Sequence, residues 1–176
     1  MAVERAVISG SPRAEGKTVR LATALQDALQ ARYPQDTVNM LMVCDLRIQG
    51  CTGCDRCRPE GECCMYDDMH SVRRVLDVSD ELYVVSPVYF AGPPAQFKAL
   101  LDRLQPYYWH RVEAPKRPAS LVVVGEGGDP HGFEPLQTCT RSALACAGFE
   151  LETVVSCVGM DVDEGASTML SALMGS

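Results

Sequence analysis

Five of the chain's nine cysteines lie close together in one short segment. They are Cys51, Cys54, Cys57, Cys63 and Cys64, and the first four follow the spacing C-x2-C-x2-C-x5-C. Four thiolates on one short loop can bind a cubane iron-sulfur cluster, although they also suit a tetrahedral zinc ion. The tight repeat is more typical of ferredoxins than of zinc ribbons. Free or disulfide-forming thiols are a third alternative, and Cys64 is an alternative fourth ligand.

A second chemical signal is the small, polar segment SGSPRAEGKT at residues 9–18. It joins an apolar run to a helical pattern, so in a parallel sheet it would lie at the carboxyl end of a strand. Backbone amides and a helix N-terminus bind anions at that place. The hydroxyls of Ser11 and Thr18 can donate to a phosphate group, and Arg13 supplies a fixed positive fork.

This segment departs from the P-loop of nucleotide triphosphatases. The Walker A pattern places four residues between its two glycines, whereas Gly10 and Gly16 enclose five. The strand expected at 82–85 runs into Ser86 and Pro87, where such an enzyme needs an aspartate for Mg²⁺. A P-loop site is therefore disfavoured, and a polar turn without a ligand is the other alternative.

The elements that must position these residues alternate between strand and helix patterns. Strand-type runs are expected at 5–8, 37–43, 82–85, 121–124 and 151–157. Helical periods are expected at 18–32, 68–78, 93–104 and 134–147, with a last short helix after residue 163. This alternation predicts a parallel sheet with helices on both faces. The pattern fails from 44 to 66, which predicts a long loop that carries function.

Composition narrows the class of partner. The chain has 176 residues, so one domain is expected, and a net charge of −7 argues against nucleic acid and anionic membranes as partners. The sequence shows neither a basic n-region with an apolar h-region nor an apolar run near the roughly 20 residues of a membrane span. A cytoplasmic protein is expected, in which Cys44, Cys139, Cys146 and Cys157 would be buried apolar residues.

Three segments occur together in a recognisable order: SGSPRAEGKT, CTGCDRCRPEGECCMYDDM and SPVYFAGPPAQFKALLDR. Between about Ala6 and Arg103 they resemble the NADPH-dependent FMN reductase and iron-sulfur flavoprotein branch of the flavodoxin-like superfamily. The resemblance implies an α/β fold with a doubly wound, five-stranded parallel sheet of order 2-1-3-4-5 in three layers. It implies one flavodoxin-like domain over 1–176, with a Cys-rich insertion at about 44–66.

The resemblance also implies which residues hold FMN. Its phosphate would be bound by Ser9, Ser11, Arg13, Lys17 and Thr18. The flavin ring would lie beside the segment 86–92, where the cofactor-binding residues are Ser86, Pro87, Val88, Tyr89, Phe90 and Gly92. The glycine turn after the fourth strand would add Gly125 and Gly127. Two alternatives remain: the aromatics could be core residues, and the glycine turn could lack any ligand contact.

Reversible electron transfer through the flavin is the expected function. NAD(P)H would be the co-substrate, and electrons would leave to a quinone, free flavin or an acceptor protein, with no protein acid or base required. A [4Fe-4S] cluster on Cys51, Cys54, Cys57 and Cys63 would exchange single electrons with FMN. A carrier without NAD(P)H turnover and a zinc-stabilised module are the rivals. A homodimer or homotetramer is expected, with the aromatic segment 107–110 facing either a neighbouring subunit or its own sheet.

Overall fold

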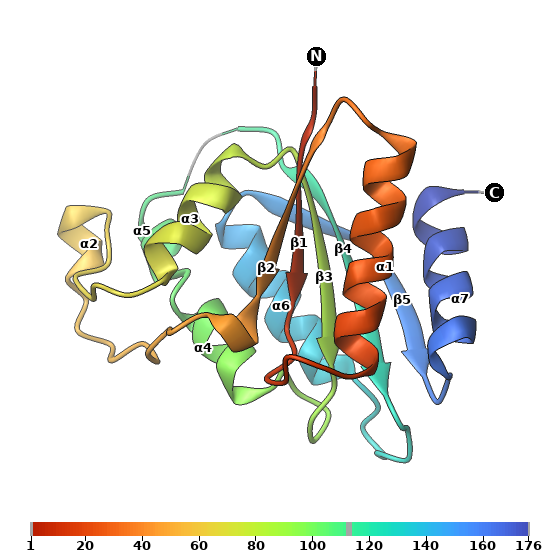
Figure 1. Ribbon diagram of the computed structural model, residues 1–176. Helices are drawn as coiled ribbons and strands as arrows, with labels where there is room; N and C mark the ends of the chain where they lie inside the picture. The colour runs from red at the N-terminus through yellow and green to blue at the C-terminus, as the bar shows by residue number, and fades with distance from the viewer. Residues whose placement is uncertain (1, 112–113, 176) are drawn as a thin grey trace.

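Five parallel strands form one sheet at the centre of the computed structural model, which describes residues 2–111 and 114–175. The strands are β1 (Glu4–Ser9), β2 (Thr37–Met42), β3 (Glu81–Pro87), β4 (Arg117–Gly125) and β5 (Phe149–Val158). Their order is β2-β1-β3-β4-β5, and every pairing is parallel (Figure 1). The predicted doubly wound sheet of order 2-1-3-4-5 is confirmed.

Helices cover both faces of this sheet. They are α1 (Lys17–Arg32), α2 (Cys57–Glu60), α3 (Met69–Val78), α4 (Ala95–Asp102), α5 (Gln105–Trp109), α6 (Glu134–Cys146) and α7 (Val162–Met174), with a 3-10 turn at Val43–Asp45. Figure 1 shows α1 and α7 together on one face, and α3, α4 and α6 on the other. The final helix spans 13 residues, so the sequence prediction of a barely formed last helix was too short.

Two apolar clusters, one on each face, explain the continuous hydrophobic runs of the strands. Along β4, Leu121 and Val123 pack with α3, α4 and α6, while Val122 and Val124 pack with α1 and α7. Successive side chains of a strand point to opposite faces, so a strand covered on both sides needs apolar residues at every position. The sequence therefore reads as an unbroken apolar run.

The helix predicted at 93–104 is shorter than expected and is followed by a separate helix. Helix α4 ends at Asp102, and α5 begins at Gln105 with Pro106 in its first turn. Proline has no amide hydrogen, and its ring collides with the carbonyl four residues earlier, which here belongs to Asp102. The chain therefore leaves the first helix and turns through Arg103 and Leu104.

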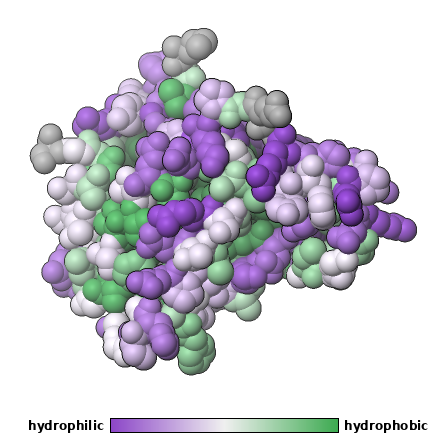
Figure 2. Space-filling view, turned by 180° about the vertical axis from the view of Figure 1, so that it is seen from behind, coloured by the Kyte–Doolittle hydropathy of each residue, from purple (hydrophilic) through white to green (hydrophobic). Residues whose placement is uncertain are grey.

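The segment between β2 and α3 forms a lobe at the side of the molecule (Figure 1). It contains one helix, the four residues of α2, within the predicted loop. Seen from behind, this lobe has a mainly polar surface, whereas apolar patches gather on the main body (Figure 2). In the described parts of the chain, each helix is too short or too polar to cross a membrane.

Candidate functional site

The turn between β1 and α1 is shaped to receive an anion. The Ser11 hydroxyl accepts from the Arg13 amide at 3.1 Å and donates to the Arg13 carbonyl at 3.0 Å, which closes the turn locally. No side chain among the described residues caps the start of α1, and its first turn contains Lys17 but no acidic residue. The amides of that turn therefore remain free to bind a negative group.

Gly10 brings this turn against β3. Its amide donates to the Val85 carbonyl at 2.8 Å, and a Cβ at this position would lie 2.9 Å from the Ser86 hydroxyl and 3.1 Å from the Phe97 ring. A side chain does not fit in that space. The close approach places the turn at the carboxyl end of two neighbouring strands.

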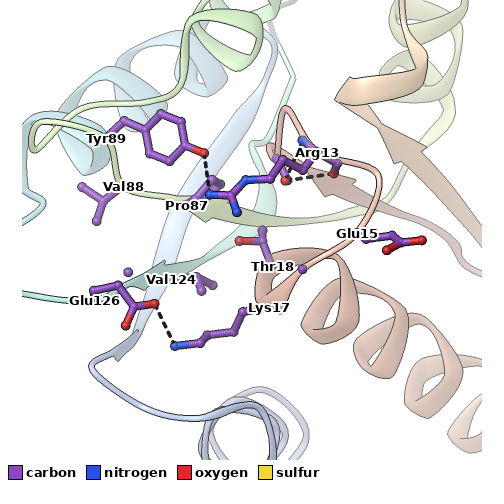
Figure 3. A pocket seen from close by; sticks show the side chains of 12 residues that line it. Arg13, Glu15, Lys17, Thr18, Pro87, Val88, Tyr89, Val124 and Glu126 are labelled. Carbon is purple, nitrogen blue, oxygen red and sulfur yellow. Dashed lines mark hydrogen bonds and ion pairs between the residues drawn. The ribbon is translucent and has the colours of Figure 1, made fainter.

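A cavity of about 260 Å³, here called the turn cavity, lies between the ends of β1, β3 and β4 (Figure 3). Its walls are Ser11, Arg13, Glu15, Gly16, Lys17, Thr18, Pro87, Val88, Tyr89, Val124, Gly125 and Glu126. Across it, Arg13 donates to the Tyr89 hydroxyl at 3.3 Å, and the Lys17 ammonium lies 3.3 Å from a Glu126 carboxylate oxygen. The Glu126 side chain is 90% exposed, so an incoming anion can replace it at Lys17.

A second cavity of about 480 Å³, the hairpin cavity, shares Val88 and Glu126 with the first. The other residues of its wall are Phe90, Ala91, Gly127, Gly128, Asp129, Gly132, Phe133, Ser156 and Val158. The two cavities therefore adjoin each other along the carboxyl edge of β3, β4 and β5. In doubly wound sheets this edge is where ligands bind.

A tight hairpin from Tyr89 to Gly92 borders the hairpin cavity. The two residues pair through backbone hydrogen bonds of 2.9 and 3.0 Å, while Phe90 and Ala91 have φ angles of 49° and 62°. Two central residues with positive φ define a type I′ turn, which favours asparagine and glycine over bulky residues. The Leu136 amide of α6 donates to the Ala91 carbonyl at 3.0 Å and anchors the turn. Strain of this kind gathers at ligand sites.

Most of the predicted cofactor-binding residues line these two cavities. In the wall of the turn cavity are Ser11, Arg13, Lys17, Thr18, Pro87, Val88, Tyr89 and Gly125, and in the wall of the hairpin cavity are Phe90 and Gly127. Phe90 is fully exposed and Tyr89 is partly exposed, so neither is a core aromatic. Ser9, Ser86 and Gly92 lie outside both walls. Ser9 and Ser86 are buried, and the Ser86 hydroxyl donates to the Pro87 carbonyl at 3.1 Å.

The wall residues supplied by β5 and by the segment just before α6 were not predicted from the sequence. Ser156 and Val158 come from the end of β5, and Phe133 precedes α6. Their position at the carboxyl edge of the sheet is the signal from which they could have been predicted. At Gly125 a Cβ would lie 2.6 Å from the Val88 side chain, so this glycine accommodates Val88 in addition to bordering the turn cavity.

All five clustered cysteines line a third cavity of about 200 Å³, the cysteine cavity. Its wall is Cys51, Thr52, Gly53, Cys54, Asp55, Cys57, Cys63, Cys64, Met65, Arg103, Gln105 and Pro106. Four thiolates at about 2.3 Å from one zinc ion would bring all their sulfurs within roughly 4 Å of each other. Within residues 2–111 and 114–175, no three Cys, His, Asp or Glu side chains are arranged to hold a single ion. The sulfurs of Cys54 and Cys64 lie 3.9 Å apart, and the thiol donors of this cavity are of the type that iron-sulfur groups and zinc both bind.

The ends of the cysteine-bearing loop meet at a neck formed by residues 47–49 and 65–69. The Arg47 and Gln49 amides donate to Asp68 and Asp67 at 2.7 and 3.1 Å. Arg103 forms an ion pair with Asp67 at 2.6 Å, where their side chains are only 1% and 7% exposed. Burial disfavours the charged carboxylate, yet hydrogen bonds from Arg103 and from the Gln49 and Met69 amides hold the pKa of Asp67 below its ordinary value.

The aromatic segment at 107–110 packs largely on its own chain. The Tyr107 hydroxyl donates to Asp77 at 2.6 Å, the Arg58 guanidinium lies 4.7 Å from the Trp109 ring centre, and His110 Nε2 is 2.8 Å from the Arg58 carbonyl. Tyr108 is 47% exposed. The segment therefore holds α2 against α5, and its exposed residues are Tyr108 and His110.

Four further cysteines were predicted to be buried. Cys157 is buried, and its thiol donates to the Gly165 carbonyl at 3.4 Å. Cys44, Cys139 and Cys146 are half-buried, so the prediction was wrong for these three. Cys139 and Cys146 lie on the outer side of α6, where they line a surface groove with α4 and α5.

Known proteins share both the sequence and the fold. An iron-sulfur flavoprotein of Archaeoglobus fulgidus is 34% identical over 124 residues, which cover 70% of this chain and 55% of that protein. An iron-sulfur flavoprotein of Methanocaldococcus jannaschii is 37% identical over 100 residues, 56% of this chain and 50% of that protein. The chain thus spans about half the length of these curated relatives.

A solved structure, the NAD(P)H:quinone oxidoreductase of Methanothermobacter marburgensis, has the same fold at 14% identity, with a TM-score of 0.67. The match covers 98% of this chain and 96% of that one. The family model described as NADPH-dependent FMN reductase matches residues 4–156, which include β1 to β4, most of β5 and every wall residue of the two cavities except Val158. The chain therefore belongs to the NADPH-dependent FMN reductase family, whose members are FMN-dependent oxidoreductases with a flavodoxin-like fold.

Proposed function

We propose that the chain binds FMN along the carboxyl edge of the sheet and uses it to oxidise NAD(P)H. The observation that carries this proposal is the pair of adjoining cavities between the ends of β1, β3, β4 and β5. The turn cavity offers cations and free amides for a phosphate, and the hairpin cavity offers a wider space. A phosphate with a flat ring attached to it matches both.

Each side chain of the turn cavity has a binding role in this proposal. Lys17 leaves Glu126 and pairs with the phosphate, while Arg13 is held by Tyr89 within reach of the same group. Thr18 and the first amides of α1 complete the anion site. The phosphate thereby fixes one end of the cofactor.

The hairpin and the glycine turn orient the other end. Bound FMN supplies hydride and single-electron chemistry, so the chain's own task is to place the ring and tune its surroundings. The hydrogen bonds between Tyr89 and Gly92, and from Leu136 to Ala91, hold the strained backbone of this loop in one conformation. The exposed Phe90 ring then lies at the open side, where it limits access by water and substrate.

The cysteine cavity is proposed to hold a [4Fe-4S] cluster through Cys51, Cys54, Cys57 and Cys63. The cavity walls bring the four thiols together, and the two relatives are named iron-sulfur flavoproteins. Such a cluster supplies one-electron transfer, which FMN can match. We propose a small molecule or a protein as electron acceptor, a cytoplasmic location and a homodimer or homotetramer.

Spectra of protein purified without oxygen test these assignments, with iron, sulfide, zinc and FMN assayed on the same sample. Flavin bands that bleach on addition of NADH or NADPH are expected, together with a broad iron-sulfur shoulder and matching iron. Flavin bands that bleach in a sample without iron would support the reductase assignment and refute the cluster assignment. A colourless chain that takes up no added FMN would overturn the proposal, and zinc without flavin would support an interaction module.

A further inference from the structure

Arg103, directly after α4, is a buried charged residue in the wall of the cysteine cavity, which is unusual for a cavity lined by thiols. Arg103 is 1% exposed and is the largest fully buried side chain of the described residues. A buried charge is unfavourable unless it is paired and hydrogen-bonded, so its place in the fold needs a reason. Its guanidinium borders the cysteine cavity together with Cys63 and Met65.

Arg103 joins both ends of the cysteine-bearing loop. Nη1 donates to the Gln49 carbonyl at 2.9 Å and to Asp67 at 2.6 Å, and Nη2 donates to Asp67 at 3.0 Å and to the Met65 carbonyl at 3.4 Å. Gln49 lies two residues before Cys51, and Met65 directly follows Cys64. One planar group thus fixes the points where the chain enters and leaves the cysteine segment.

The guanidinium is not fully used by these contacts. Nε is buried but has no hydrogen-bond partner among the described residues. A buried donor without a partner costs free energy, and such groups are often found where a ligand is missing. Cys63 is one of the groups that face this guanidinium, and its sulfur is the type of acceptor that a bound thiolate or sulfide would offer.

The two adjacent cysteines differ in their surroundings. Cys63 is half-buried beside Arg103, whereas Cys64 is exposed and its sulfur lies 3.9 Å from that of Cys54. Cys63 thus shares a wall with a buried hydrogen-bond donor, whereas the Cys64 sulfur faces another thiol. The surroundings therefore distinguish two residues that the spacing alone leaves equivalent.

We propose that Arg103 is a positioning residue of the cysteine cavity, which fixes both ends of the loop and directs Cys63, not Cys64, to the fourth ligand position. This inference rests on the proposed iron-sulfur site. The positive charge also favours the more negative, reduced state of the bound group, so removing it lowers the reduction potential.

The test compares four variants with the wild-type chain after reconstitution with ferrous iron and sulfide under anaerobic conditions. They are Cys63→Ser, Cys64→Ser, the double variant Arg103→Gln with Asp67→Asn, and the control Arg58→Gln. The double variant removes both buried charges, so neither is left uncompensated. Because Arg103 lines the cavity and Asp67 does not, the cluster still loses the nearer, positive charge. Arg58→Gln removes an exposed positive charge from the same loop. Iron, sulfide, FMN and the cluster's reduction potential are measured for each.

We expect Cys63→Ser to lose most of its iron and keep FMN, while Cys64→Ser and Arg58→Gln retain both. The double variant should keep FMN and either lose iron or hold it at a lower potential. Wild-type iron and potential in the double variant would overturn the role of Arg103. Iron lost from Cys64→Ser but kept by Cys63→Ser would overturn the ligand choice.

FMN content reports whether the rest of the fold is intact. If the double variant loses FMN as well, the single variant Arg103→Lys is used to test the role of Arg103. Lysine keeps the buried positive charge but lacks the planar set of hydrogen-bond donors. Iron loss with FMN retained would then support the inference, and unchanged iron and potential would refute it. A wild-type chain that binds FMN but no iron would instead refute the cluster in the proposed function, and the inference with it.

Discussion

The carboxyl edge of the sheet and the cysteine cavity are held in shape by different means. The turn and hairpin cavities lie at the ends of strands that belong to the main core, and short turns shape their walls. The cysteine cavity lies in a lobe with one four-residue helix, and its neck depends on one buried ion pair and a few backbone bonds. The main core therefore fixes the geometry of the carboxyl edge, whereas a few individual contacts fix the geometry of the cysteine cavity.

This difference predicts how each region responds to change. A substitution at the carboxyl edge should alter the affinity for a ligand and leave the rest of the molecule in place. A substitution at the neck should free the whole cysteine segment, because few other contacts order it. Single substitutions, made in one region or the other, can distinguish a change in ligand affinity from release of the cysteine segment.

The largest effect is expected for Asp67→Ala. The change leaves Arg103 buried without its partner, which costs about 3–5 kcal/mol in the free energy of unfolding. Urea denaturation measures this loss, and faster alkylation of Cys57 reports release of the loop. The control Asp102→Ala breaks the exposed pair with Lys98 on α4 and should cost about 0.5 kcal/mol or less. Equal losses in the two variants would contradict the special role of the neck.

Acid should act on the same contact without a substitution. The folded-state pKa of Asp67 lies below its ordinary value, so its ionisation stabilises the fold above the unfolded pKa of about 3.9. That contribution is lost as the pH falls from about 4 through the folded pKa. Hydrogen exchange of the backbone amides of the cysteine loop, followed across this range, should show the loop opening in the wild type. Asp67→Asn should remove this part of the pH dependence.

At the carboxyl edge, Lys17→Ala should weaken FMN binding without unfolding the chain. Loss of a charge-assisted hydrogen bond to phosphate costs about 1.5–3 kcal/mol, or roughly 10- to 100-fold in affinity. Fluorescence titration measures this change. Riboflavin lacks the phosphate, so its affinity should stay the same in the variant. Arg20→Ala removes an exposed charge from the same helix outside the cavity wall and should leave FMN binding nearly unchanged.

Phe90→Asn tests the strain in the hairpin. Asparagine tolerates positive φ, so we expect the free energy of unfolding to rise by about 1 kcal/mol. The same variant should oxidise NAD(P)H faster, because the ring that limits access of the substrate to the flavin is removed. Val78→Asn replaces another exposed apolar residue, one without positive φ and outside the neck, and should change neither stability nor turnover appreciably. A destabilised Phe90→Asn would show that the turn is not strained.

The smallest effect is expected for Glu126→Gln. The exposed pair with Lys17 is worth about 0.2–1 kcal/mol, so its removal should tighten FMN binding by up to roughly 5-fold. High salt should shrink the difference between the variant and the wild type. Glu15→Gln removes a charge from the same wall but breaks no recorded ion pair, so its effect on affinity should be smaller. Weaker FMN binding in Glu126→Gln would mean that Glu126 contacts the cofactor favourably.

The sheet could be predicted from the sequence because its signals are local and repeated. Apolar runs such as 121–124 must be buried on both faces, and the alternation with helices leaves few allowed topologies. The anion turn could be found for the same reason, since its small residues and its place before a helix are adjacent in the chain. The clustering of five cysteines was equally plain.

Only the tertiary structure decided which residues from distant segments meet. In the sequence, Arg103 looks like the end of an amphipathic helix. In the structure Pro106 ends α4 early, and the Arg103 side chain turns into the cysteine loop, where it contacts Asp67, 36 residues away in the chain. Lys17 and Glu126 are 109 residues apart and meet because β1 and β4 end at the same edge. The sequence by itself determined the strands, the turn and the cysteine spacing, because each depends on neighbours in the chain. The walls of the cavities depend on packing across the sheet, which no local pattern encodes.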